Sequence, residues 1–221
     1  MTYPLPAPAR TTTTSTSTAR RLGGRRALRC GLAAGPLFLG AGIVQGLTRD
    51  GFDFTRNALS QLALGGAGWV QTLNFLVVGA LLGVGAVGLR RARVGGRGGP
   101  VLIGVFGLSF WAAAAFPADA GAGFPVGAPD ATAMSGAGAV HMAGGMIGYL
   151  ALCAAFLVLA RPLAERGHRA WAVASWVVPV VVLAGFLASA ASVLAFTCGA
   201  ALGLLWLSAV MARLAAAPVQ H

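Results

Sequence analysis

All 16 basic side chains of this 221-residue chain are arginines, and they gather between long apolar segments in a repeating order. The clusters Arg20–Arg29, Arg90–Arg97 and Arg161–Arg169 are each separated by two apolar segments, and the loops between those segments hold all four aspartates. In multi-pass membrane proteins, short loops rich in arginine or lysine remain in the cytoplasm. The alternation therefore predicts a helical membrane protein with a defined orientation.

The composition excludes an ordinary soluble domain. The chain is 57% hydrophobic and 10% charged, whereas soluble domains contain about 25% charged residues. The net charge of +11 arises from arginines that flank apolar segments and are not interleaved with aromatic residues on one face, so we expect no nucleic-acid partner. We expect the arginine clusters to attract the anionic headgroups of membrane lipids instead.

Six helices account for the apolar sequence. A bilayer core is spanned by about 20 helical residues, and residues 27–47, 69–89, 100–116 and 140–160 form four such segments. The uncharged run 170–211 is about twice the necessary length, so it must fold into two helices. We place the turn near Ser189–Ser192, where small polar residues cluster, with a re-entrant pair as the alternative. The predicted fold is an all-α transmembrane bundle of six helices.

The predicted bundle occupies residues 27–213, between a disordered basic tail at 1–26 and a short tail at 214–221. Fourteen of the 16 arginines fall on one side of it. The arginine rule then places both termini in the cytoplasm and the loops 48–68 and 117–139 outside. The absence of lysine and the richness in Ala, Gly and Arg indicate a GC-rich bacterial genome, so we expect the bacterial cytoplasmic membrane.

Glycine pairs four residues apart occur in several of these segments, for example Gly31/Gly35, Gly79/Gly83 and Gly199/Gly203. Such pairs let helix backbones approach closely, and this is a main source of helix association in lipid. Because the pairs are spread over several segments, they favour packing within one chain. A homodimer formed through the Gly-rich helix faces is the alternative.

The first outer loop has helical spacing over residues 54–64, with Asp53 at the position of an N-cap. One interpretation is an interfacial helix with a solvated polar face. The other is a lid that presents Asp53, Arg56, Asn57 and Ser60 to a polar cavity. On the second interpretation, the candidate ligand-binding residues are Asp53, Arg56 and Asn57.

The second outer loop is rich in Gly and Pro, so we expect it to be irregular. Asp119 follows the third helix and His141 opens the fourth. A neutral imidazole beside a carboxylate can act as a base or bind a metal. The alternative is an Asp119–His141 hydrogen bond that merely ties the loop between two helix ends.

These residues define the candidate chemistry. The catalytic candidates are His141, Asp119 and Ser60, and a metal could use Asp53, Asp119 and His141 as a mixed oxygen and nitrogen set. The close ligand spacing that identifies metal motifs is missing. Haem is not expected because intramembrane histidine pairs are lacking, and no other cofactor is indicated. The absence of charged residues within the apolar segments disfavours ion-coupled transport.

Three segments resemble the domain-of-unknown-function-998 (DUF998) family of bacterial six-helix membrane proteins. Residues 57–82, NALSQLALGGAGWVQTLNFLVVGALL, have a Ser-x-Leu before a Gly-rich turn and a Trp; FPADAG at 116–121 and SGAGAVH at 135–141 are similar to a Phe-Pro-x-Asp segment and a later Gly-x-x-His. The likeness covers residues 30–210, although a polar Gly-Leu-x-x-Arg-type stretch near the sixth helix is absent. It carries over Ser60, Asp119 and His141, and it implies the fold and an outward polar cluster without implying an activity.

The sequence therefore predicts an integral inner-membrane protein that binds a lipid or small apolar ligand near an outward-facing polar vestibule. A membrane-embedded hydrolase acting on a lipid-like substrate at the outer leaflet is the first alternative. A small transporter is the second.

Overall fold

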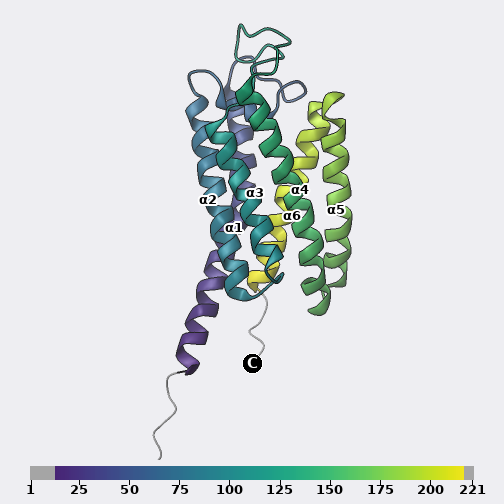
Figure 1. The fold of residues 1–221 in the computed structure, drawn as a ribbon. Helices are drawn as coiled ribbons and strands as arrows, with labels where there is room; N and C mark the ends of the chain where they lie inside the picture. Colours follow the sequence, from purple (N-terminus) through teal and green to yellow (C-terminus); the bar gives the residue numbers. More distant parts are fainter. Residues whose placement is uncertain (1–12, 217–221) are drawn as a thin grey trace, which may run out of the picture.

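The computed structural model describes residues 13–216, with side chains from Gly23 onward, and this range is all-helical. The predicted six-helix bundle is confirmed there (Figure 1). Two short 3-10 helices join the long ones: η1 (Leu59–Ala63) and η2 (Ala188–Ala190). The six long helices are α1 (Thr13–Thr48), α2 (Gly68–Ala92), α3 (Gly98–Ala115), α4 (Gly136–Glu165), α5 (Arg169–Leu187) and α6 (Val193–Ala216).

All six long helices are long and apolar enough to cross a membrane, with candidate spans of 18 to 30 residues. Their outward faces carry aliphatic side chains such as Val44, Val101 and Val180, each more than 60% exposed. A soluble protein rarely exposes so much contiguous apolar surface, whereas lipid tails solvate it without cost. The molecule is a multi-pass membrane protein.

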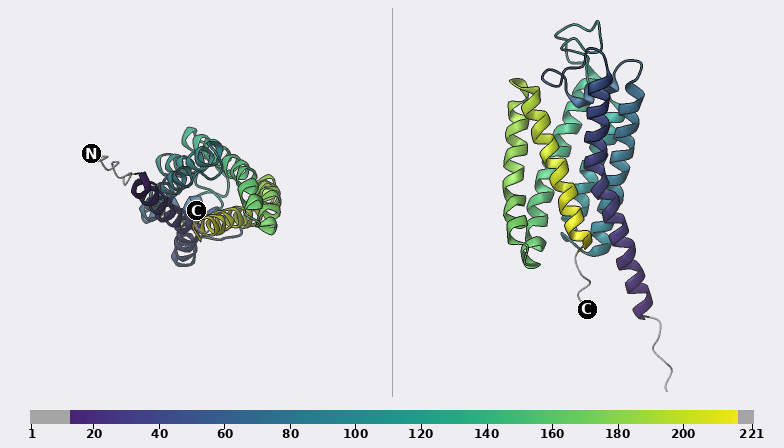
Figure 2. Two further views of the ribbon diagram at one scale, coloured as in Figure 1. Left: turned by 90° about the horizontal axis from the view of Figure 1, so that it is seen from below. Right: turned by 180° about the vertical axis from the view of Figure 1, so that it is seen from behind.

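The helices form a ring in chain order. Each long helix packs against its neighbours in sequence, and α6 closes the ring against α1, as the view along the bundle shows (Figure 2). The ring follows from the short connections, because a short loop can only lead into an adjacent antiparallel helix. An up-and-down ring of six helices has its first and last helix ends on the same side.

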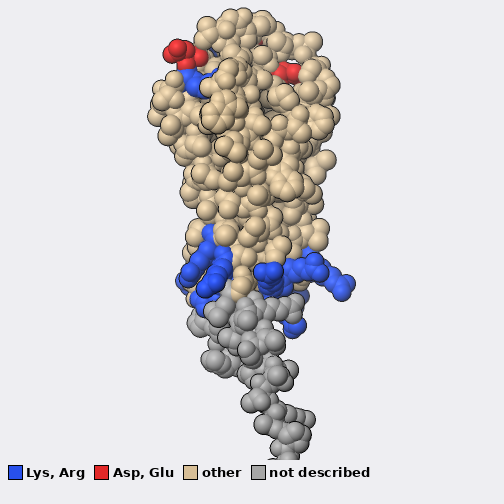
Figure 3. Space-filling view, turned by 90° about the vertical axis from the view of Figure 1, so that its left-hand side faces the viewer, with Lys and Arg blue, Asp and Glu red and all other residues tan. Residues whose placement is uncertain are grey.

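Charge divides the two ends of the bundle. The described arginines of α1, α2, α4, α5, α6 and of the α2–α3 and α4–α5 connections lie at one end, which we call the arginine end. Asp53, Asp119 and Asp130 lie at the other, the loop end, together with Arg49 and Arg56. Figure 3 shows most of the basic surface at the arginine end and the acidic surface at the loop end. The sequence predicted this sidedness from the arginine clusters. The side of the membrane that each end faces stays a prediction.

Glycines hold the helices together at close range. Gly31 of α1 faces Gly85 of α2 so closely that a Cβ on either residue would lie 3.0 Å from the Cα of the other. Gly35 packs in the same way against the backbone of α6 at Leu204. The predicted use of small residues for packing within the chain is confirmed at these contacts, and the homodimer stays a prediction.

Buried amides also join α1 to α2. Gln45 Nε2 donates to Gln71 Oε1 at 2.8 Å, and Asn74 Nδ2 donates to the Phe38 carbonyl at 3.3 Å. Both amides therefore bond one helix to the other, and Gln71 is fully buried at the centre of the cluster.

Several helix bounds differ from those predicted. α1 begins at Thr13 and not near Ala27, so residues 13–26 are helical where we expected a disordered tail. Once a helix is nucleated, each further residue adds a hydrogen bond, and no proline interrupts this stretch. α6 likewise extends to Ala216. Residues 1–12 and 217–221, the rest of the two predicted tails, lie outside the described residues.

The turn in the long uncharged run is confirmed. α5 ends at Leu187, η2 follows, and α6 begins at Val193. α4 begins earlier than predicted, at Gly136, because Ser135 caps it: the Ser135 hydroxyl accepts a hydrogen bond from the Gly138 N–H at 2.9 Å. Ser is among the preferred residues at this position.

Candidate ligand-binding cavity and its loop layer

A cavity of about 310 Å³ lies inside the loop-end half of the bundle. All six long helices and η1 contribute to its wall, so it occupies the centre of the ring. Most of the wall is apolar, with small Ala and Gly residues between large aromatic rings. Six phenylalanines line it: Phe38, Phe75, Phe106, Phe110, Phe186 and Phe196.

The aromatic rings form a continuous belt. Phe38 and Phe106 each pack edge-on against Phe110, with ring centroids 5.2 Å apart in both pairs. Tyr149 extends the belt from Phe106, at 5.7 Å, to Phe196, at 6.1 Å. Edge-to-face pairs of this kind fix ring orientation, so the belt gives the cavity a preformed shape.

Six polar side chains interrupt the apolar wall: Ser60, Ser109, His141, Tyr149, Ser189 and Thr197. The Ser109 hydroxyl is satisfied within its own helix, donating to the Phe106 carbonyl at 2.7 Å. The Thr197 hydroxyl oxygen, in contrast, is buried without a hydrogen-bond partner. No Asp, Glu or Arg side chain belongs to the wall, so the cavity is neutral apart from whatever charge His141 carries.

His141 is nine-tenths buried at the start of α4, and its ring lies against Phe75. Its Nδ1 is 2.9 Å from the Phe116 carbonyl oxygen at the end of α3. A carbonyl only accepts, so Nδ1 must carry a proton and donate. Nε2 makes no hydrogen bond to the residues that the structure describes, which leaves it available to an occupant of the cavity.

Asp119 is bound to Ser135 and not to His141. Its Oδ2 accepts from the Ser135 N–H at 3.0 Å, and it also accepts from the Ser135 hydroxyl. These hydrogen bonds, the hydroxyl first, lower the pKa of Asp119 from its ordinary value. Gly138 packs so closely on the carboxylate that a Cβ there would overlap it. Asp119 therefore fastens the second loop to the first turn of α4.

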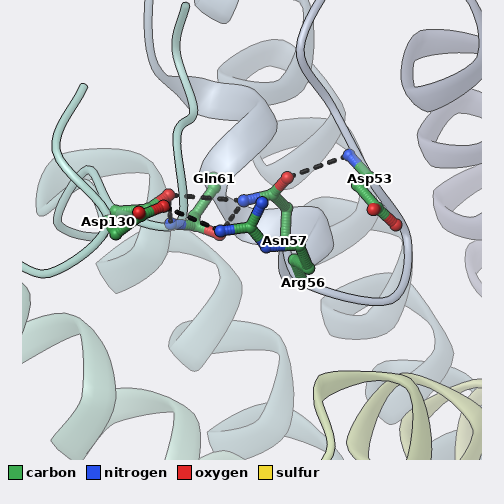
Figure 4. A network of polar contacts seen from close by, with 6 residues as sticks. Asp53, Arg56, Asn57, Gln61 and Asp130 are labelled. Carbon is green, nitrogen blue, oxygen red and sulfur yellow. Dashed lines mark hydrogen bonds and ion pairs between the residues drawn. The ribbon is translucent and has the colours of Figure 1, made fainter. Parts of the chain in front are cut away.

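Two loops cover the loop end, residues 49–67 and 116–135, and we call them together the loop layer. Asn57 is buried between them: its Oδ1 accepts from the Asp53 N–H at 2.9 Å and its Nδ2 donates to the Gly121 carbonyl at 3.3 Å (Figure 4). Gln61 Nε2 donates to the Asp119 carbonyl at 3.2 Å. The polar side chains of the first loop thus bind the backbone of the second.

The first loop differs from the predicted helix over residues 54–64. Only Leu59–Ala63 is helical, as η1, and Asp53 does not cap it. Asp53 caps a separate turn, accepting from the N–H and hydroxyl of Thr55. The cause is Asn57, whose side chain ties back to Asp53 and across to the second loop, so that the chain passes through an extended Ala58 before η1 begins.

No specific role was predicted for Arg49 from the sequence, yet in the structure it joins the two loops of the loop layer. Its guanidinium donates to the carbonyls of Leu62 and Leu64 at 2.5 and 2.6 Å and lies over the Phe124 ring, 4.9 Å from the centroid. Partial burial lowers its pKa from the ordinary value, although a guanidinium remains charged. The sequence signal for this role was the position of Arg49: it directly follows α1, on the side of the bundle that holds the aspartates.

A family model described as "Protein of unknown function (DUF998)" matches residues 32–217. The chain belongs to the DUF998 family. No curated protein and no solved structure matches it. The resemblance inferred from residues 57–82, 116–121 and 135–141 is therefore confirmed.

The segments that carry the DUF998 resemblance meet in the loop layer. Phe116 and Asp119 of one segment bind His141 and Ser135 of another, while Asn57 and Gln61 of the third bind the carbonyls of Gly121 and Asp119. Three segments that are far apart in sequence thus form one hydrogen-bonded unit above the cavity. Of the motif positions, Asp119 has a structural role, Ser60 lies in the cavity wall, and His141 combines the two.

The structure divides the predicted site residues into two groups. Ser60 and His141 line the cavity, whereas Asp53 and Asp119 are held by Thr55 and Ser135 in the loop layer. Arg56 forms an exposed ion pair with Asp130 at 2.7 Å. Among the described residues no group of three His, Cys, Asp or Glu side chains is arranged to hold a metal, so the proposed set of Asp53, Asp119 and His141 does not come together.

Proposed function

We propose that this protein binds a small, mainly apolar molecule in the cavity, from within the bacterial cytoplasmic membrane, with its arginine end in the cytoplasm. The observation that supports the proposal is the cavity itself: about 310 Å³, preformed by an aromatic belt, with a few polar groups in an apolar wall. Small-molecule sites have this size and composition. The orientation is supported by the gathering of fourteen of the 16 arginines on one side.

The geometry supports binding better than hydrolysis or transport. In a Ser–His–acid arrangement, the acid accepts from the histidine nitrogen that does not face the nucleophile. Here the Phe116 carbonyl holds Nδ1 of His141, and Asp119 is bound to Ser135. An ion-coupled carrier commonly needs a charged residue at depth, and the cavity wall contains no Asp, Glu or Arg.

The test is photolabelling in nanodiscs of phosphatidylcholine with an aliphatic diazirine probe. We expect saturable labelling of cavity residues on α4 and α6, mapped by mass spectrometry. Gly145 lines the cavity, and a Cβ there meets no atom within 4 Å. The Cβ added by Gly145→Leu therefore meets no clash, and the side chain should occupy part of the cavity and weaken labelling about 10-fold, a loss of about 1.4 kcal/mol of binding free energy.

The matched control is Ala143→Leu, which adds the same kind of bulk to an exposed position of α4. It should label like the native protein. Labelling that is not saturable, or that Gly145→Leu and Ala143→Leu leave equally unchanged, would contradict ligand binding in the cavity.

A further inference from the structure

The hydrogen-bonding state of His141 restricts what the cavity can hold. The Phe116 carbonyl requires a proton on Nδ1, so in a neutral imidazole Nε2 has a lone pair and no hydrogen. The ring is nine-tenths buried and belongs to the cavity wall. An acceptor without a protein partner in a mostly apolar wall favours an occupant that carries a hydrogen-bond donor.

The rest of the wall disfavours a charged occupant. It contains no arginine to pair with a phosphate or carboxylate and no acid to pair with an amine. A charge brought into such a site would be desolvated without compensation. The Thr197 hydroxyl oxygen is buried without a partner, so it makes the wall more polar without adding a charge. The cavity is thus built for an apolar body with a neutral polar end.

The lining residues also indicate how an occupant reaches the cavity. η1 forms part of the wall through Leu59 and Ser60, so the loop layer covers the cavity from the loop end. Only two lining residues are exposed, Met142 in the first turns of α4 and Ala190 in η2. The cavity therefore reaches the surface sideways, between α4 and the α5–α6 connection, where the bundle faces lipid.

We propose that the occupant is a neutral, hydroxyl-bearing amphiphile that enters from the membrane between α4 and η2 and donates its hydroxyl hydrogen to His141 Nε2. This inference rests on the proposed function and names the ligand class for the same cavity. Membrane lipids with a free hydroxyl and long-chain alcohols share this chemistry. The hydroxyl group, and not the length of the apolar chain, is the feature that the site recognises.

The test compares a medium-chain primary alcohol carrying a diazirine with its methyl ether, which has the same apolar body but no donor. In phosphatidylcholine nanodiscs the alcohol should half-saturate the cavity at a concentration about 3- to 10-fold lower than the ether, the factor that one net hydrogen bond provides. The corresponding carboxylate should label more weakly than either, because the site offers it no cation.

Two substitutions separate the hydrogen bond from the fold. His141→Asn keeps a side-chain N–H near the Phe116 carbonyl but removes the distal acceptor, so it should abolish the preference for the alcohol while the ether still labels. His141→Gln places an amide oxygen near the position of Nε2 and should retain a preference for the alcohol.

The outcomes distinguish the two proposals. Equal labelling by the alcohol and the ether, or an alcohol preference that survives in His141→Asn, overturns the hydroxyl inference and leaves ligand binding in place. Strongest labelling by the carboxylate overturns the neutral ligand class. If the aliphatic probe, the alcohol and the ether all fail to label the cavity saturably, ligand binding fails and the inference fails with it.

Discussion

The two halves of the bundle are built from the same kinds of residue but are packed differently. At the arginine end the centre of the ring is filled by fully buried side chains such as Phe156, Leu159 and Met211. At the loop end the centre is hollow, and the helices are held by an aromatic belt and by the hydrogen-bonded loop layer.

The difference shows how a small membrane protein can keep an open site. In lipid, helix association depends on close packing and not on removing apolar surface from water, so a cavity reduces the attraction between helices and something else must replace it. The arginine end supplies the packing, and the loop layer supplies directional hydrogen bonds that fix the positions of the helix ends. We therefore expect substitutions in the two halves to fail in different ways.

The largest expected effect is the loss of packing at the arginine end. Phe156→Ala removes a ring that is surrounded on all sides and should lower the free energy of unfolding by about 3–5 kcal/mol. Phe196→Ala removes a ring that already borders the cavity. Fewer neighbouring atoms surround this ring, so the cost should be about half as large. Reversible unfolding in mild detergent measures both, and equal losses of stability would break the distinction between the halves.

The next largest effect concerns the loop layer. Asn57→Ala leaves the Asp53 N–H without its partner, whereas the Gly121 carbonyl keeps its hydrogen bonds from the Phe124 N–H and Gln61 Nε2. The expected cost is about 1–3 kcal/mol. Because those groups lie outside the ring, hydrogen exchange should accelerate in residues 49–67 and 116–135 and stay unchanged at the arginine end. Arg56→Ala, which removes an exposed ion pair, is the control and should cost about 0–1 kcal/mol. Uniform acceleration along all six helices would show that the layer is not a separate unit.

The sequence predicted the helices better than the cavity, because helix signals are local whereas the cavity depends on contacts between residues far apart in the chain. The arginine clusters and apolar lengths predicted the six helices, and the small polar residues predicted the turn before Val193, because these signals are local. The close helix–helix contacts at Gly31 and Gly35 were also predictable, from the spacing of four residues between the two glycines. The exception is the start of α1, where a stretch rich in Thr and Ser was expected to be disordered.

The cavity was predicted less completely because it depends on contacts between distant residues. The sequence identified His141, Ser60 and Asp119 but could not tell that Phe116, and not Asp119, would bind the imidazole. Nor did any motif reveal the aromatic belt, although Phe38, Phe75 and Phe110 all fall in the loop-end halves of their helices. Asn57 was expected to bind a ligand, yet its hydrogen-bonding groups are used by the two loops.

A smaller effect should come from the contact between Gly138 and Asp119. A Cβ at position 138 would overlap the carboxylate, so Gly138→Ala should displace Asp119 from Ser135 and cost about 2 kcal/mol, as overpacking does. Gly136→Ala is the matched control in the same helix turn, because a Cβ there meets no atom within 4 Å. It should be neutral or stabilising, since Ala favours helix over Gly. Thermal unfolding of the pair measures the difference, and two equally tolerated variants would mean that the second loop is not fastened at Asp119.

The smallest effect is a pH dependence confined to the loop end. The Ser135 hydrogen bonds hold the pKa of Asp119 below its ordinary value, so the carboxylate stabilises the folded state at any pH above the unfolded pKa of about 4. That contribution is lost as the pH falls through the lower, folded pKa. The melting temperature of native protein should therefore exceed that of Asp119→Asn at neutral pH, and the two should converge in acid. Asp53→Asn provides a comparison, because hydrogen bonds from Thr55 lower the pKa of the Asp53 carboxylate in the same way. A difference between native protein and Asp119→Asn that stays constant down to acid pH would mean that the ionised form of Asp119 is not what fastens the loop layer to α4.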